Sequence, residues 1–185
     1  MKVVAIIQAR MSSTRLPGKV LKLASGRTML DRMLERVKKA RTISEVVTAT
    51  TTDPSDDSIA RACKKLGVSV FRGSLQDVLD RFYQASRMHQ ADIIVRLTGD
   101  CPLIDPALID DVVNALTRKK VDFACNRLPP PFSRTYPIGL DVEACTFNAL
   151  EQAWYGAKEK FEREHVLPYL YAVPGRFSVL QLNHT

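Results

Sequence analysis

Cationic and hydroxyl side chains gather in one short segment near the start of the chain, where residues 10–19 read Arg-Met-Ser-Ser-Thr-Arg-Leu-Pro-Gly-Lys. The segment directly follows an apolar run, residues 3–7, which is typical of a buried parallel strand. In an open α/β sheet, ligands bind in the crevice at the carboxyl ends of the strands. Three cations, three hydroxyls and a Pro-Gly turn in that place predict a site for a nucleotide or a sugar phosphate.

The spacing within this first loop differs from two familiar phosphate motifs. No G-x-G-x-x-G pattern is present, and Gly18-Lys19 is followed by Val20 without the upstream glycine of a P-loop. Side chains are therefore expected to hold the phosphates, with Arg10 and Arg15 as planar forks and Lys19 as a point charge. The alternative is a solvated basic loop, but its position after a buried strand favours a functional role.

A carboxylate follows a second strongly apolar strand, which the sequence predicts over residues 92–97. The segment reads Thr98-Gly99-Asp100, and the glycine permits close approach of the backbone. We expect Asp100 to face the same crevice as the first loop. Because Mg²⁺ takes one or two carboxylates together with phosphate oxygens, Asp100 is predicted to bind the metal rather than to cap a turn.

Two further groups carry weaker signals. Asp141 and Glu143 alternate with apolar residues, so a strand predicted over residues 140–143 would point both to one face; an ordinary half-exposed strand fits equally well. His165 lies beside a carboxylate and is interpreted as a satisfied histidine at a helix end rather than a base. Cys101 and Cys125 are interpreted as small core residues.

Composition limits the class of protein. The chain has 185 residues, 45% of them hydrophobic, which favours a single domain spanning residues 1–185 with a real core. No apolar run is long enough for a membrane span, and no signal peptide is expected. Four widely spaced cysteines without a C-x-x-C pattern indicate the reducing cytoplasm.

The positive charge is concentrated at the start of the chain. The net charge is +7, yet residues 1–41 contain eleven Lys or Arg and two Asp or Glu, which leaves −2 for the rest. Nucleic-acid binders interleave aromatic residues with such a basic stripe, and residues 1–41 contain none. A local anion site beside one solvated basic helix is therefore expected, and no nucleic-acid partner.

Strand and helix patterns alternate along most of the chain. The predicted strands cover residues 2–8, 46–52, 68–71, 92–97, 121–125, 140–143 and 177–182. Helices are predicted behind Thr28, behind Asp53-Pro54 up to Gly67, over 75–90, behind Asp105-Pro106, over 146–157 and over 163–171. A proline-rich stretch over residues 126–142 is interpreted as a loop or arm. The order indicates an α/β three-layer sandwich with a mostly parallel sheet.

At the level of motifs, residues 6–21 closely resemble the opening of the cytidylyltransferases that activate acidic sugars, especially the spore-coat polysaccharide biosynthesis protein F group. Further matching motifs follow in order at residues 72–74, 77–81, 97–106, 139–143 and 163–166. The resemblance implies a fold of the nucleotide-diphosphosugar transferase type. It implies a reaction in which CTP and an acidic sugar give a CMP-sugar and pyrophosphate, with Mg²⁺ as cofactor.

The resemblance also assigns residues to roles. It implies catalytic roles for Arg15, Lys19 and Asp100, and Mg²⁺ binding by Asp100 and Asp141. The residues expected at the nucleotide are Gln8, Ala9, Arg10, Ser12, Ser13, Arg15, Lys19, Gly73, Asp77, Arg81 and Thr98. The residues expected at the sugar are Arg127, Arg134, Tyr136, Asp141 and Glu143, with Arg127, Arg134 or Tyr136 taking its carboxylate.

The chain departs from the related enzymes in two places, and other functions stay open. Related enzymes carry an Asp-Thr-x-x-Asp segment after the last strand, which suggests that this chain is truncated, that Asp141 substitutes, or that the metal site is incomplete. The first loop differs from the sialic-acid-activating version, so the sequence does not name the sugar. A glycosyltransferase is disfavoured because Pro102 stands where its second metal Asp would be; a non-catalytic nucleotide-binding module is the third reading. The proline-rich loop and the resemblance together suggest a homodimer.

Overall fold

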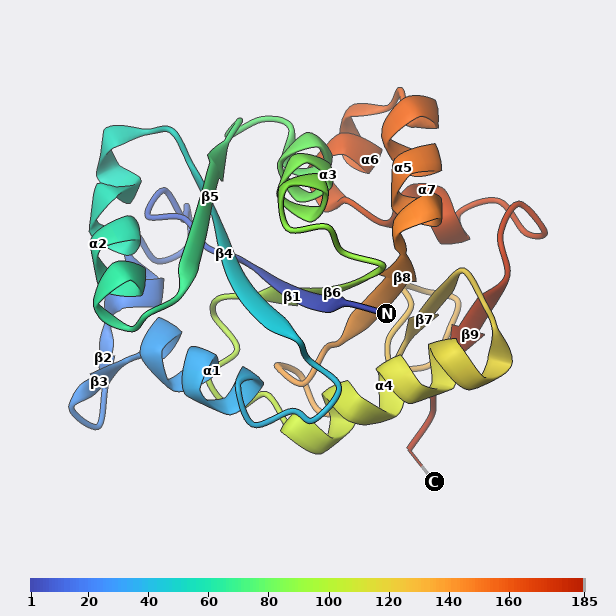
Figure 1. Cartoon of the computed structure of the whole chain (residues 1–185), viewed down its shortest axis with the longest axis horizontal. Helices are drawn as coiled ribbons and strands as arrows, with labels where there is room; N and C mark the ends of the chain where they lie inside the picture. Colours follow the sequence, from blue (N-terminus) through green and yellow to red (C-terminus); the bar gives the residue numbers. More distant parts are fainter. Residues whose placement is uncertain (185) are drawn as a thin grey trace.

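The computed structural model describes residues 1–184. It consists of a seven-stranded sheet with helices on both faces, beside a small two-stranded sheet (Figure 1). The strands, in their order across the sheet, are β5 (Ser69–Gly73), β4 (Glu45–Thr51), β1 (Val3–Gln8), β6 (Ile93–Thr98), β8 (Glu143–Thr146), β7 (Phe123–Cys125) and β9 (Val179–Gln181). All neighbours are parallel except β8, which runs antiparallel to both β6 and β7. The mostly parallel α/β sandwich predicted from the sequence is confirmed.

Two apolar layers hold the helices against the sheet. One joins the sheet to α1 (Met29–Val37), α2 (Asp57–Lys65) and α4 (Pro106–Lys119). The other joins it to α3 (Val78–Met88), α5 (Phe147–Gly156) and α7 (Pro168–Tyr171), and the short α6 (Lys160–His165) packs on α3 and α7 (Figure 1). Five of the six residues of β1 are buried because it lies between β4 and β6 under both layers, which explains its continuous apolar run.

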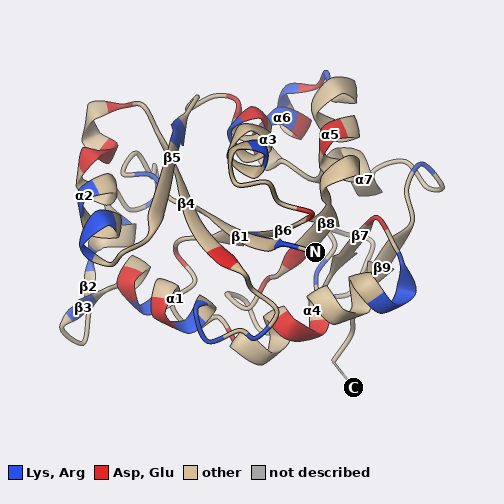
Figure 2. Ribbon diagram, in the orientation of Figure 1, with Lys and Arg blue, Asp and Glu red and all other residues tan. Residues whose placement is uncertain are grey.

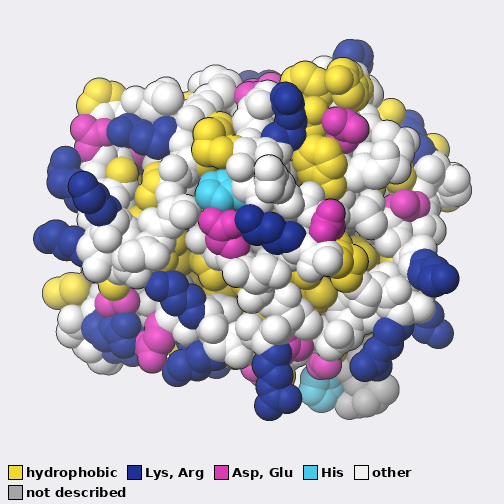
Figure 3. All heavy atoms as spheres, viewed as in Figure 1, with side chains coloured by type: hydrophobic (Ala, Val, Ile, Leu, Met, Phe, Trp, Pro, Cys, Tyr) yellow, Lys and Arg dark blue, Asp and Glu magenta, His cyan; other side chains and the backbone are white. Residues whose placement is uncertain are grey.

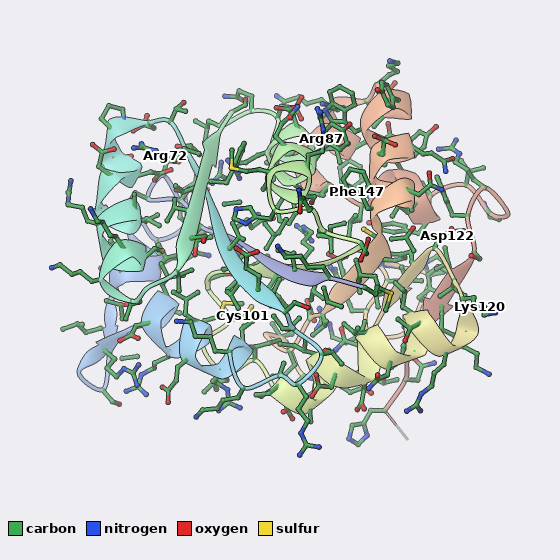
Figure 4. The ribbon with its side chains drawn as sticks, in the orientation of Figure 1. Arg72, Arg87, Cys101, Lys120, Asp122 and Phe147 are labelled. Atoms are coloured by element: carbon green, nitrogen blue, oxygen red, sulfur yellow. The ribbon has the colours of Figure 1, made fainter. Side chains whose placement is uncertain are left out.

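Smaller elements complete the chain. A two-stranded hairpin of β2 (Leu23–Ala24) and β3 (Arg27–Thr28) precedes α1, and two short 3-10 helices, η1 (Lys19–Leu21) and η2 (Pro54–Asp56), follow the first loop and β4. Arg72 of β5 ties this edge to the start of α2, since its guanidinium donates to Asp57 at 2.6 Å (Figure 4). None of the helices in residues 1–184 has the length and apolar content that a bilayer span would need.

Helix starts agree with the capping residues read from the sequence. The Thr28 hydroxyl accepts a hydrogen bond from the Asp31 amide at 3.0 Å, and α1 begins at the next residue. Asp105 caps α4 by accepting a hydrogen bond from the Ala107 amide, and Pro106 is the first residue of that helix. Gly67, in the left-handed conformation with φ 63°, ends the helix before it as predicted.

Two predicted elements are wrong. The strand predicted over residues 140–143 instead begins at Glu143, because the Asn126 side chain binds the Leu140 carbonyl and the Val142 amide, both at 2.8 Å. The single helix predicted over residues 163–171 is two helices, α6 and α7. Pro168 lacks an amide hydrogen and cannot continue α6, and Val166 between the helices has φ 74°.

Candidate active site

The carboxyl ends of β1 and β6 lie side by side and open into a cavity. Gln8 pairs with Thr98 in the parallel register, and the Gly99 amide donates to the Gln8 carbonyl at 2.8 Å. A Cβ on Gly99 would stand 3.1 Å from that carbonyl oxygen, so the glycine lets the two chains leave the sheet close together. The cavity has a volume of about 370 Å³ and is bounded by the first loop, the end of β6, the start of α3 and the end of α6.

The structure brings most of the predicted nucleotide and catalytic residues into this one cavity. Those that line it are Gln8, Ala9, Arg10, Ser13, Arg15, Lys19, Arg81, Thr98 and Asp100. The cations of the first loop therefore share a cavity with Asp100, which follows β6, as expected for residues at the carboxyl ends of neighbouring parallel strands. Their roles in binding and catalysis stay predictions.

A buried aspartate anchors the first loop. Asp56 of η2 is 1% exposed and accepts hydrogen bonds from the Met11 amide at 2.7 Å and the Thr51 amide at 3.0 Å. Met11 in turn accepts at its carbonyl from the amide of Gly18, which has φ 68°. The loop thus folds back on itself and is tied to β4, which holds its cations at the strand ends.

Lys19 and Asp100 form an ion pair inside the cavity. Burial acts to raise the pKa of Asp100, but hydrogen bonds from Lys19 and Thr98 outweigh it and hold that pKa below the usual range of a carboxyl. Asp100 is therefore ionised at neutral pH and available to a cation. Cys101 follows it, is partly buried and packs against the apolar layer beneath α1 and α4 (Figure 4), whereas Cys125 is fully buried in the core as predicted.

Arg81 is the buried cation of the site. It is 2% exposed, its Nη1 donates to the Ser74 carbonyl at 2.9 Å, and its Nε has no hydrogen-bond acceptor. Burial, and then the nearby positive charge of Arg10, lower the pKa of Arg81 to about 10. Gly73 does not line the cavity; it packs against the Arg81 stem, which leaves 3.2 Å for a Cβ at that position.

Several predicted residues lie outside the cavity. Ser12 and Asp77 do not line it, and neither do the five residues assigned to the sugar: Arg127, Arg134, Tyr136, Asp141 and Glu143. Arg134 and Asp141 bind each other through two hydrogen bonds of 2.7 and 3.0 Å. The structure therefore does not bring Asp141 together with Asp100 in this cavity, although the sequence analysis expected both to bind one metal. Glu143 instead pairs with Arg96, which does line the cavity.

Other lining residues were missed by the sequence analysis. Arg96 comes from the middle of β6, Leu75 and Gln76 precede α3, and Glu164 and His165 come from the end of α6. His165 was interpreted as an ordinary histidine at a helix end. Residue periodicity does not predict its place in the cavity, because that place depends on the packing of α6 against α3; the one signal in the sequence is the matching motif at residues 163–166.

An ion pair holds α6 in that place. Arg163 donates to both carboxylate oxygens of Asp77 at 3.0 Å and to the Trp154 carbonyl at 2.7 Å. Asp77 also caps α3 by accepting from the Asp80 amide at 2.9 Å. One carboxylate thus joins the start of α3 to the end of α6, and both segments line the cavity.

Comparison with known proteins gives a consistent family. Residues 4–185 match the family model described as Cytidylyltransferase. The chain is 46% identical over 182 residues to an uncharacterized protein of Methanocaldococcus jannaschii, covering 98% of this chain and 72% of that protein. It is 35% identical over 179 residues to the spore coat polysaccharide biosynthesis protein SpsF of Bacillus subtilis, covering 94% and 72%.

The chain is also similar to an enzyme whose name states its reaction and to a cytidylyltransferase of solved structure. A 3-deoxy-manno-octulosonate cytidylyltransferase of Geobacter metallireducens is 40% identical over 118 residues, which are 63% of this chain and 45% of that enzyme. The structure of a cytidylyltransferase from Leptospira borgpetersenii superimposes with a TM-score of 0.92 at 40% identity, covering all of this chain and 76% of that one.

Proposed function

Because the chain belongs to the cytidylyltransferase family, we propose that it activates an acidic sugar with CTP, giving a CMP-sugar and pyrophosphate for polysaccharide biosynthesis. The names of the spore coat protein and of the 3-deoxy-manno-octulosonate enzyme support this direction. The particular acid and a homodimer stay predictions.

One observation carries the proposal: three cations of the first loop line the same cavity as the ionised Asp100. A triphosphate carries several negative charges, and a guanidinium binds its oxygens as a planar fork. In our proposal Arg10, Arg15 and Lys19 bind the phosphates of CTP. Lys19 now pairs with Asp100, so it can turn to the phosphates when a nucleotide enters.

The reaction asks the protein mainly to position and to neutralise charge. The anomeric hydroxyl of the sugar gives up its proton to water and attacks the α-phosphorus. The bond from that phosphorus to the oxygen that bridges the α- and β-phosphates breaks, and pyrophosphate leaves in line. Negative charge grows on the leaving pyrophosphate as that bond breaks. In our proposal Arg15 and Lys19, carried by the anchored loop, stabilise this charge in the transition state.

The residues present fit a divalent cation that binds together with the nucleotide. Mg²⁺ is commonly held by one or two carboxylates and the phosphates of the substrate, and Asp100 offers an ionised carboxylate in the cavity. Asp100 would hold the metal. When bound, the metal would neutralise phosphate charge as a Lewis acid.

A pyrophosphate-release assay tests the proposal. Wild-type protein with Mg²⁺ would be offered each of the four nucleoside triphosphates against a panel of octulosonic and nonulosonic acids. We expect release with CTP and at least one acid. We expect Arg15→Ala and Asp100→Asn each to lower the rate on the order of 10²–10³-fold, as seen when one donor is lost from a preorganised site.

The matched control is Arg118→Ala, which removes an exposed arginine from the last turn of α4, outside the cavity. This variant should release pyrophosphate like the wild type, and circular dichroism should show all variants folded. Normal turnover by folded Arg15→Ala or Asp100→Asn would contradict the roles proposed for those residues. Release with a neutral sugar only would contradict the proposed substrate class.

A further inference from the structure

Arg96 is a charged residue in the middle of a buried strand. Its neighbours Val95 and Leu97 belong to the apolar layer beneath α1 and α4, so Arg96 projects to the opposite face of β6, the face that carries Ile94. There it lines the cavity. Glu143 stands directly opposite in the β6–β8 register and accepts a hydrogen bond from its Nη1. Both side chains are 15% exposed.

The Arg96 guanidinium has more hydrogen-bonding capacity than the protein uses. It carries five N–H donors, and across residues 1–184 its one protein acceptor is Glu143. Its Nε is buried without a partner. The buried atoms Gln8 Oε1 and Arg81 Nε also have no partner, and both residues line the same cavity. Unpaired polar atoms of this kind are expected where a ligand supplies the missing partners.

The stability of the fold does not by itself explain why Arg96 and Glu143 are charged. Removing two charges from water is costly, and an apolar pair of similar size is often as stable as a buried ion pair or more so. Ile94, on the same face of β6, shows that an apolar side chain packs there. A charged pair kept at the wall of a cavity points instead to binding.

We propose that Arg96 receives the carboxylate of the acidic sugar and that Glu143 is a positioning residue that orients its guanidinium. This inference rests on the proposed function and names the residue that selects the substrate. A planar guanidinium with free N–H groups binds a carboxylate through two parallel hydrogen bonds. Arg96 lies on the side of the cavity toward β8, whereas the phosphate-binding cations come from the loop after β1.

In this proposal Arg96 takes the role that the resemblance implied for Arg127, Arg134 or Tyr136. Arg127 and Arg134 do not line the cavity, and the Nη1 and Nη2 groups of Arg134 already bind Asp141. Tyr136 packs edge-on against His184, at 5.5 Å between ring centroids.

The test compares an acid with its neutral analogue. Wild type and Arg96→Gln would be assayed for CTP-dependent pyrophosphate release with the acids 3-deoxy-manno-octulosonate and N-acetylneuraminate, and with the primary amide of each. We expect wild type to prefer the acid it uses over its amide by about 10- to 100-fold in kcat/KM, the effect of one charged hydrogen-bonded contact. Arg96→Gln should lose that preference and keep its KM for CTP within about twofold, since another part of the cavity holds the phosphates.

A second variant guards against a folding defect. Arg96→Gln leaves Glu143 buried without its partner, so Arg96→Gln with Glu143→Gln replaces both charges by neutral amides and leaves no unpaired charge. This double variant should fold and also lose the preference for the acid. Glu143→Gln alone keeps the Arg96 charge and should raise the KM for the acid while keeping part of the preference.

The outcomes separate the two proposals. If wild type uses an acid and Arg96→Gln keeps the preference for acid over amide, the role of Arg96 is wrong and the proposed function stands. If Arg127→Gln or Arg134→Gln removes the preference instead, the carboxylate lies elsewhere. If wild type releases pyrophosphate with neither acid, the proposed function is refuted for these substrates and the Arg96 inference is overturned with it.

Discussion

Arg81 combines full burial with an incomplete set of partners. Its Nε has no acceptor, burial lowers its pKa to about 10, and no carboxylate within residues 1–184 forms an ion pair with it. A lowered arginine pKa means that folding disfavours the charged form, so the protein loses stability by keeping this charge at neutral pH. Binding of an anion would supply the missing partner.

Replacing Arg81 by methionine should therefore separate stability from binding. We expect Arg81→Met to leave the free energy of unfolding unchanged or to raise it by about 1–2 kcal/mol, because an unbranched apolar side chain fills similar space without a charge. CTP affinity should fall by about tenfold or more, since a charged hydrogen bond is lost. Urea unfolding and calorimetric titration with CTP measure the two effects. A large loss of stability together with normal CTP affinity would show that Arg81 is structural.

The residues of the first loop and of β6 differ in how far sequence could predict them. Arg10, Arg15, Lys19 and Asp100 could be predicted together because parallel strands end at one edge of the sheet, so residues that follow β1 and β6 must meet. Arg96 could not be predicted, because its role depends on a partner strand that is far away in sequence and antiparallel.

At the scale of elements, α6 shows how a short helix reaches the cavity. It has six residues, too few for stability of its own, so contacts with the rest of the protein must fix it. The Asp77–Arg163 pair supplies one such contact, and a capping box between Glu159 and Glu162 closes the first turn. The positions of Glu164 and His165 therefore depend on the pair.

The exchange Asp77→Asn tests this dependence. Asparagine caps a helix about as well as aspartate, so α3 should keep its start while the ion pair to Arg163 is lost. We expect thermal stability to fall modestly and kcat/KM for the sugar to fall several-fold more than kcat/KM for CTP, because in our proposal the first loop holds the phosphates of CTP and the end of α6 borders the part of the cavity left for the sugar. Steady-state kinetics with each substrate varied in turn would measure this split.

The control is Arg27→Met, which removes two ion pairs, with Asp31 and with Glu35, on the exposed face of α1. This change should leave both kinetic parameters as in wild type. Equal losses for the two substrates in Asp77→Asn would show that the pair supports the whole fold and not α6 in particular.

The errors of element prediction have local physical causes. Capping residues marked the starts of α1 and α4 because the first turn of a helix needs acceptors for its free amides. Polar and apolar residues alternate over residues 140–143 as in a strand. The Asn126 side chain, however, binds the backbone groups of Leu140 and Val142 that would otherwise pair with a neighbouring strand. Alternation predicts which side chains share a face of a strand, but it does not predict which groups form hydrogen bonds with the backbone.

At the scale of the whole molecule, charge is more dispersed than the sequence suggests. Lys and Arg are concentrated in residues 1–41, but acidic side chains lie among them on α1 (Figure 2). Arg27 binds Asp31 and Glu35, Lys39 binds Glu35, and Lys38 donates to the Leu66 carbonyl. Figure 3 shows blue and magenta side chains mixed along this edge of the molecule. On the face that Figure 3 shows, this edge does not form the continuous basic stripe that nucleic-acid backbones bind.

Ligand binding in the cavity should raise the stability of the whole protein. A ligand that binds only the folded state stabilises it by about 2.7 kcal/mol at 100 times its Kd, which corresponds to a rise in Tm of roughly 5–10 °C for a domain of this size. We expect such a rise with CTP and Mg²⁺, and a smaller one with CTP and EDTA because Asp100 then faces the phosphates without a metal. Differential scanning fluorimetry measures both.

The same measurement with a single-stranded DNA oligomer tests the reading of the charge. A protein that makes 6–10 phosphate contacts loses about 10³–10⁵ in affinity as salt rises from roughly 50 to 200 mM. Because the cations on and beside α1 are paired with acids or carbonyls, the oligomer should give little shift in Tm at either salt concentration. An oligomer that stabilised the protein as strongly as CTP at low salt, and lost that effect at high salt, would contradict this reading. The cavity beside β1 would then have to share its anion-binding role with the exposed face of α1.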